Sequence, residues 1–115
     1  MDFAPSIYEH CARFIGRRPW EVSRDAELLF AAQAEAFRRY GHRPVVVGVD
    51  IYNLEAEAYG ATVAEAEGNG IPAVTCPWCA SVEEVAGLAP FDPAVAGRIP
   101  MVIAVGRRLR AEFPE

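Results

Sequence analysis

The run Val45-Val46-Val47-Gly48-Val49-Asp50 constrains the fold more than any other part of the sequence. Its β-branched side chains favour extended backbone. Because its apolar residues do not alternate with polar ones, the run indicates a strand covered on both faces, as in a parallel sheet. Parallel strands need parallel neighbours reached by crossover connections. The rest of the sequence contains no evident partner for this strand, so the predicted sheet is incomplete.

Two helices are predicted before this strand. The first covers about Ile7–Ile15, where Ser6 and Glu9 have the spacing of a capping box. The second covers about Arg24–Tyr40, with Ser23 as its N-cap. An irregular link joins the two predicted helices.

After the strand, the sequence predicts two short helices, a β-hairpin with a glycine-rich turn, and a longer last helix. The predicted ranges are Leu54–Tyr59 (helix), Thr62–Ala66 and Ile71–Val74 (hairpin), Ser81–Gly87 (helix) and Ile99–Phe113 (last helix). Residues 99–105 could instead form a second strand. A helix is favoured because Val102, Val105 and Leu109 share one helical face and Pro100 suits a first helical turn.

Length and composition set further limits. A chain of 115 residues is one domain at most, and a complete (β/α)8 barrel needs about 200 residues or more. No apolar run is long enough to cross a membrane, and no secretory signal is evident. A net charge of −5 without a clustered basic surface argues against nucleic-acid binding. Three cysteines without a signal favour a reducing, cytoplasmic location.

Asp50 is the leading candidate for a functional residue. An acid at the carboxyl end of a buried parallel strand lies where active sites of α/β proteins are found. Asp50 could accept hydrogen bonds from substrate N–H groups or act as a general acid or base, or it could simply cap the next helix. Asn53 could line the same site. Glu55 and Glu57 do not share a helical face, so they are better explained as acids of a first helical turn.

Arg17 and His10 are further candidates. Arg17 lies on the irregular link between the two predicted helices, where an arginine can bind a carboxylate or phosphate. The alternative is a basic pair, Arg17 with Arg18, on the surface. His10 precedes this link and could contribute to the same site.

Cys76 and Cys79 form a C-x-x-C pair. Such a pair can be redox-active or can provide half of a zinc site. The only other sulfur and imidazole ligands are Cys11, His10 and His42, and their spacing matches no known zinc pattern. An ordinary loop is therefore the favoured interpretation, and no metal site is predicted.

The order of these elements resembles the uroporphyrinogen decarboxylase-like superfamily, which includes corrinoid-dependent methyltransferases. The resemblance rests on two N-terminal helices, a strand that ends in Asp50-Ile51, and the following Glu57-Ala58-Tyr59-Gly60. A hairpin, a Ser-x-Glu-Glu helix, an Asp-Pro loop and a helix ending in Arg-Arg-Leu complete it. The segment Gly16–Glu21 looks like a degenerate form of an arginine-rich substrate-binding segment of the decarboxylases.

The resemblance implies the α/β fold of a (β/α)8 TIM barrel, of which this chain would hold the N-terminal portion. Residues 1–115 would form a single incomplete domain, with N-terminal helices in 1–41. The first barrel strand, the hairpin and the remaining helices would occupy 42–115.

The implied reaction is decarboxylation of acetate side chains on a tetrapyrrole, without a cofactor. Asp50 would hold the pyrrole nitrogens, while Arg17 and Arg13 would bind substrate carboxylates. One alternative is methyl transfer in the cobamide- and zinc-dependent branch. Another is a non-catalytic fragment or subunit, in which a partner chain or second copy covers the strand at 45–49. The isolated chain is expected to be inactive.

Overall fold

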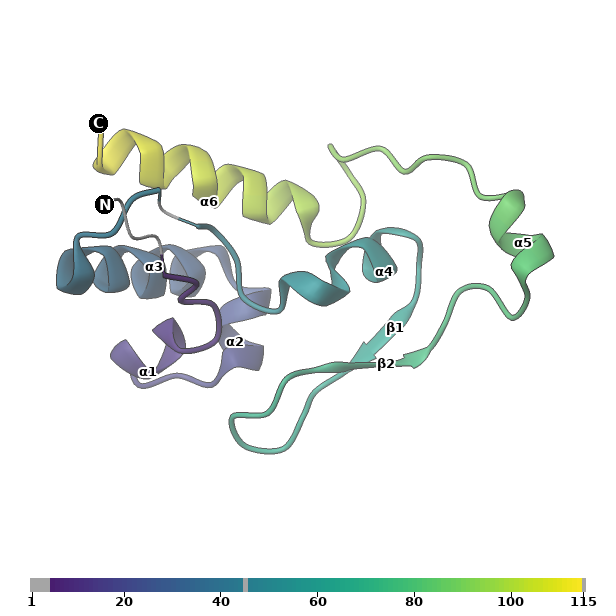
Figure 1. Ribbon diagram of the computed structural model, residues 1–115, viewed down its shortest axis with the longest axis horizontal. Coiled ribbons are helices and arrows are strands. Elements are labelled where there is room, and N and C mark those ends of the chain that lie inside the picture. The colour runs from purple at the N-terminus through teal and green to yellow at the C-terminus, as the bar shows by residue number, and fades with distance from the viewer. Residues whose placement is uncertain (1–4, 45, 115) are drawn as a thin grey trace.

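The computed structural model describes residues 5–44 and 46–114. Figure 1 shows a helical body from which a hairpin and a long connection extend. In chain order the elements are α1 (Cys11–Phe14), α2 (Pro19–Arg24), α3 (Ala26–Tyr40), the 3₁₀ helix η1 (Ile51–Asn53), α4 (Leu54–Ala58), β1 (Thr62–Ala64), β2 (Ala73–Cys76), α5 (Val82–Ala86) and α6 (Ile99–Glu112). In the described residues, no helix is long and apolar enough to cross a membrane.

The core lies where α1, α2 and α6 pack against α3. Leu29 on α3, Val22 on α2, and Val105 and Leu109 on α6 are buried there. The last helix is therefore confirmed, including its predicted apolar face. Pro100 lies in its first turn. Proline has no backbone N–H, and in a first helical turn that N–H would have no helical acceptor in any case.

The start of α3 differs from the prediction. Ser23 does not cap it, because Ser23 lies inside α2, where its hydroxyl donates to the Trp20 carbonyl at 2.9 Å. Asp25 is the N-cap, and its carboxylate accepts from the backbone N–H of Leu28 at 2.9 Å. Pro19 begins α2, since its fixed φ suits a first helical turn. The predicted irregular link is thus partly helical.

The first helix is also shorter than predicted. Only Cys11–Phe14 form α1, and its N-cap is His10 rather than Ser6. The Glu9 carboxylate accepts instead from the backbone N–H of Asp50, at 3.1 Å. The Glu9 side chain therefore forms a tertiary hydrogen bond to Asp50 instead of the predicted capping-box bond near Ser6.

The prediction of a strand at 45–50 is wrong for the residues that the structure describes, 46–50. Residues 46–50 form no strand, and Val45 lies outside the described residues. The described sheet contains β1 and β2 alone, paired antiparallel with Val63 opposite Val74. Because no described strand lies beside residues 46–50, side chains form hydrogen bonds to the backbone of this segment in place of a neighbouring strand. The described fold is a partial α/β domain, and the barrel portion stays a prediction.

The hairpin is confirmed, although β2 begins later than expected and reaches Cys76. Every residue of β2 is exposed. After β2 the chain runs through α5 and a long loop before it returns to the helical body at α6 (Figure 1). The radius of gyration is 15.4 Å, compared with about 13 Å for a compact chain of this size. The hairpin and α5 therefore form an extended arm, residues 62–97.

His42 makes stability depend on pH. Its side chain is buried near Phe37 and Tyr40, and desolvation lowers its pKa from 6.5. The unfolded chain therefore binds more protons than the folded chain just below pH 6.5, so stability is lost as the pH falls from about 6.5 toward the lower folded pKa. Urea unfolding between pH 7.5 and 5.5 should show this loss.

The matched pair of variants is His42→Leu and His10→Leu. Removing the buried imidazole of His42 should flatten the pH profile in this range, whereas removing the exposed imidazole of His10 should leave the profile close to that of the parent chain. An unchanged profile in His42→Leu would contradict the assignment.

Candidate functional site

The candidate site is built around Asp50, at the junction between segment 46–50 and η1. Asp50 is 0% exposed, and its backbone is left-handed, with φ 55° and ψ 48°. This conformation costs a non-glycine residue roughly 1–2 kcal/mol, so surrounding contacts must hold it. The Glu9 carboxylate, which accepts from the Asp50 N–H, is one of them.

Asn53 lies one helical turn after Asp50, as predicted from its position. Its amide donates to Asp50 Oδ1 at 2.5 Å and to the carbonyl of Pro72 at 2.9 Å. The second bond ties the site to the residue just before β2. Asn53 is itself buried, so this amide connects the acid to the hairpin within a water-poor environment.

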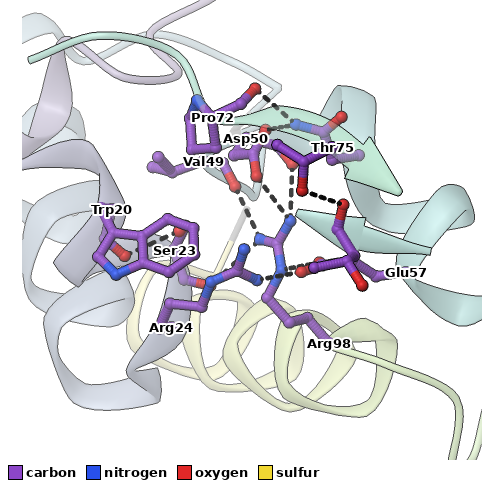
Figure 2. Close-up of polar contacts among 11 residues, drawn as sticks. Trp20, Ser23, Arg24, Val49, Asp50, Glu57, Pro72, Thr75 and Arg98 are labelled. Carbon is purple, nitrogen blue, oxygen red and sulfur yellow. Dashed lines mark hydrogen bonds and ion pairs between the residues drawn. The ribbon is translucent and has the colours of Figure 1, made fainter. Parts of the chain in front are cut away.

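Arg98 is the main partner of Asp50, and it was not among the residues predicted for the site. Its Nη2 donates to Asp50 Oδ2 at 2.9 Å and to the Asp50 carbonyl at 3.0 Å. Its Nη1 donates to the carbonyls of Val49 and Ser23, at 3.2 and 3.1 Å. Figure 2 shows the guanidinium between these groups. One buried cation therefore binds the acid and the backbone of the segment that carries it.

Glu57 completes the ionic network. Its carboxylate pairs with Arg98 through Nε and with Arg24 Nη1 at 2.6 Å (Figure 2). Arg24 also lies over the Trp20 ring, 4.1 Å from its centroid. Two carboxylates and two guanidiniums thus alternate in the order Asp50, Arg98, Glu57 and Arg24. Glu57 was expected to be only a first-turn acid, whereas Glu55, two residues earlier, is exposed.

Two opposing effects set the charge on Asp50. Burial raises the pKa of the Asp50 carboxyl, while the Arg98 guanidinium and the Asn53 amide favour the ionised form and lower it. The upward effect of burial is the larger. Both carboxylate oxygens have protein donors. Each carboxylate oxygen of Asp50 is therefore held by a side chain from another part of the chain, Asn53 on Oδ1 and Arg98 on Oδ2.

The other predicted site residues are exposed, on α1 or beside it. His10 is exposed and packs edge-on against Phe14, with ring centroids 4.9 Å apart. Arg13 is exposed in the last turn of α1. Arg17 is exposed and pairs with Glu21 at 3.4 Å. Among the described residues, no hydrogen bond or ion pair joins any of these three to Asp50.

Two hollows lie elsewhere on the described surface. One of about 280 Å³ includes His10, with Pro5, Ser6, Ile7 and Tyr40 around it. The other, of about 800 Å³, lies beside the second half of α6. Its lining residues are Arg43, Pro44, Val47, Gly106, Leu109, Arg110, Phe113 and Pro114. Neither includes Asp50. Within residues 5–44 and 46–114, no group of three or more His, Cys, Asp or Glu side chains is placed to hold a metal ion.

One signal in the sequence could have identified Arg98. A cation directly before a helix faces the positive end of the helix dipole, which is unfavourable, and Arg98 is the N-cap of α6. An arginine at this position therefore indicates an anionic partner elsewhere in the fold. The anionic partners are Asp50 and Glu57, which lie 48 and 41 residues before Arg98 in the sequence. The sequence signal alone does not identify them.

Comparison with known proteins identifies a family for this chain. Residues 4–115 match the family described as uroporphyrinogen decarboxylase (URO-D). No curated protein and no solved structure gives a significant match. Because the family match covers nearly the whole sequence, the chain belongs to the uroporphyrinogen decarboxylase family.

Proposed function

We propose that this chain is a non-catalytic framework part of a uroporphyrinogen decarboxylase-type site. The observation that carries the proposal is the enclosure of Asp50, which is 0% exposed with both carboxylate oxygens bound by Asn53 and Arg98. An acid that holds pyrrole N–H groups must reach its ligand within hydrogen-bond distance. In this arrangement Asp50 cannot do so, and it acts as a positioning residue for segment 46–50.

The positions of the arginines also support this proposal. Arg13 and Arg17 were expected to bind substrate carboxylates next to Asp50, yet both are exposed, and Arg17 pairs with Glu21 instead. Arg98, the arginine that does contact Asp50, is buried and already hydrogen-bonded through Nε, Nη1 and Nη2. Among the described residues, the arginines around Asp50 therefore bind protein groups, and Arg13 and Arg17 form no contact with them.

The reaction in which the chain would take part is decarboxylation of acetate side chains on a tetrapyrrole. Family membership supports this choice of chemistry. We further propose that a partner surface completes the site. The exposed arm supports this, since Val82 and Val95 are 81% and 76% exposed. Residues 46 and 47 support it too, because their amides and carbonyls make no backbone–backbone hydrogen bond among the described residues.

The test is a direct assay of the purified 115-residue chain with uroporphyrinogen under anaerobic conditions, separating the porphyrin products by chromatography. We expect no coproporphyrinogen above the level of a reaction without protein, while an active uroporphyrinogen decarboxylase in the same assay forms it. Turnover by the chain would overturn the non-catalytic proposal. An Asp50→Asn variant would then show whether Asp50 carries that turnover.

A further inference from the structure

The cysteine pair Cys76 and Cys79 takes no part in the network around Asp50. Cys76 is the last residue of β2 and is exposed, while Cys79 follows in the next loop and is partly exposed. Both are free thiols. The C-x-x-C spacing is that of paired zinc ligands, which bind the metal as thiolates. The chain thus presents two soft ligands together on its extended arm.

The backbone around this pair is held on both sides. Cys76 pairs with Thr62 across the hairpin, and the Thr75 hydroxyl donates to the Thr62 carbonyl at 3.4 Å. Trp78, between the cysteines, packs against the turn before β1. A Cβ added at Gly60 would lie 2.7 Å from Trp78 Cδ1. The Trp78 ring therefore lies against the backbone of Gly60, where any larger residue would clash with the ring. This contact holds the loop in place.

Two thiolates do not complete the coordination of Zn²⁺, because structural zinc sites have four ligands in a tetrahedral arrangement. The remaining histidine and cysteine side chains of this chain are poor sources for the other two. The Cys11 thiol is fully buried and donates to the Tyr8 carbonyl, and His42 is buried beside α3. His10 is exposed, but it lies at the N-cap of α1 with its ring against Phe14. Among the described residues, no third His, Cys, Asp or Glu joins the pair. Within one chain, the described residues therefore leave the zinc site half complete.

We propose that Cys76 and Cys79 of two copies of this chain bind one Zn²⁺ between them. A two-fold axis brings the same patch of each copy together, so two identical pairs supply four thiolates. The arm extends away from the helical body (Figure 1), which leaves room for a second copy. The exposed apolar side chains Val74, Trp78, Val82 and Val85 lie close to the pair in sequence, and the second copy would cover part of this surface.

The chemistry of the site makes zinc binding and dimer formation one event. Each thiol loses a proton as it binds the metal, so up to four protons leave per Zn²⁺ and affinity falls as the pH decreases. Four thiolates and one Zn²⁺ carry a net charge of −2. This proposal does not depend on the proposed function, since it uses no residue of the Asp50 network.

The experiment uses the reduced 115-residue chain without a metal-binding tag, titrated with Zn²⁺ under inert gas. Native mass spectrometry and light scattering should show one Zn²⁺ per two chains and a shift from monomer to dimer at that ratio. Titration with Co²⁺ should give the intense visible absorption of a tetrahedral site and the near-ultraviolet charge-transfer bands of thiolate ligands. Addition of a chelator should restore the monomer.

Three cysteine variants test the assignment. Cys76→Ser and Cys79→Ser should each weaken Zn²⁺ binding by at least about 100-fold and abolish the metal-dependent dimer. Cys11→Ala is the matched control and should bind Zn²⁺ like the parent chain. Circular dichroism of each variant shows whether the chain is folded, and both pair cysteines are accessible enough that serine should be tolerated.

Several results would overturn the proposal. One Zn²⁺ bound per monomer would mean that ligands other than a second copy complete the site. A dimer that persists in chelator, or one that Cys76→Ser leaves intact, would remove the role of the metal. A reduced chain that binds no Zn²⁺ but closes a Cys76–Cys79 disulfide on oxidation would indicate a redox pair instead.

Discussion

Replacing Arg98 with methionine is expected to lower the free energy of unfolding by about 3–5 kcal/mol. The side chain of Arg98 is 9% exposed and that of its partner Asp50 is 0% exposed. Without the guanidinium, the Asp50 carboxylate is buried without its cation, and the carbonyls of Ser23 and Val49 lose their Arg98 donor. Urea unfolding followed by circular dichroism measures the loss.

The matched control is Arg107→Met, because Arg107 is an exposed arginine on the same helix. It should change the free energy of unfolding by less than about 0.5 kcal/mol. The double variant Arg98→Met/Asp50→Asn removes both buried charges and should cost less than the sum of the single variants, by about 1–3 kcal/mol. A loss below about 1 kcal/mol in Arg98→Met would show that the network contributes little to the fold.

Replacing Gly48 with alanine is expected to lower the free energy of unfolding by about 2–4 kcal/mol. Gly48 has φ 136°, a region that other residues rarely adopt. An added Cβ would lie 2.4 Å from Ile51 Cγ2, so segment 46–50 or η1 must shift. The Gly48 carbonyl, which accepts from the buried Gln33 amide at 3.2 Å, would move with it. Thermal and urea unfolding both report the loss.

Two comparisons separate the sources of this effect. Gly68→Ala also alters a glycine of positive φ, 58°, but its Cβ would meet nothing within 4 Å, so it measures backbone strain alone. Adding Ile51→Ala to Gly48→Ala removes the colliding methyl group and should recover part of the loss relative to Ile51→Ala alone. Equal losses in Gly48→Ala and Gly68→Ala would contradict the close contact between Gly48 and Ile51.

Local signals predicted several elements correctly. The last helix forms, and Val105 and Leu109 lie on its buried face as expected. Helix α5 lies within the predicted range Ser81–Gly87, with Ser81 accepting from the Glu84 N–H at 3.3 Å. Helix α3 ends at Tyr40 as predicted, where Gly41 follows in a left-handed conformation. Each of these depends on residues within about one helical turn of one another, which is why the sequence alone was sufficient.

Signals that depend on distant partners were less reliable. The β-branched run at 46–49 predicted a strand, but strand formation requires a neighbouring strand, and Gln33 and Arg98 bind its carbonyls instead. Glu9 was predicted to cap a helix and binds Asp50 N–H instead. In each case a hydrogen bond between residues far apart in the sequence formed in place of the predicted one.

By itself, the sequence determined the family, most of the helices, the hairpin, and the proximity of Asn53 to Asp50. Only the tertiary structure decided the partners of Asp50, because Arg98 is 48 residues away and Glu9 is 41 residues away. It also decided that Asp50 is enclosed. Burial depends on which elements pack together, and no spacing of residues along a chain specifies which charged side chains meet in the space between them.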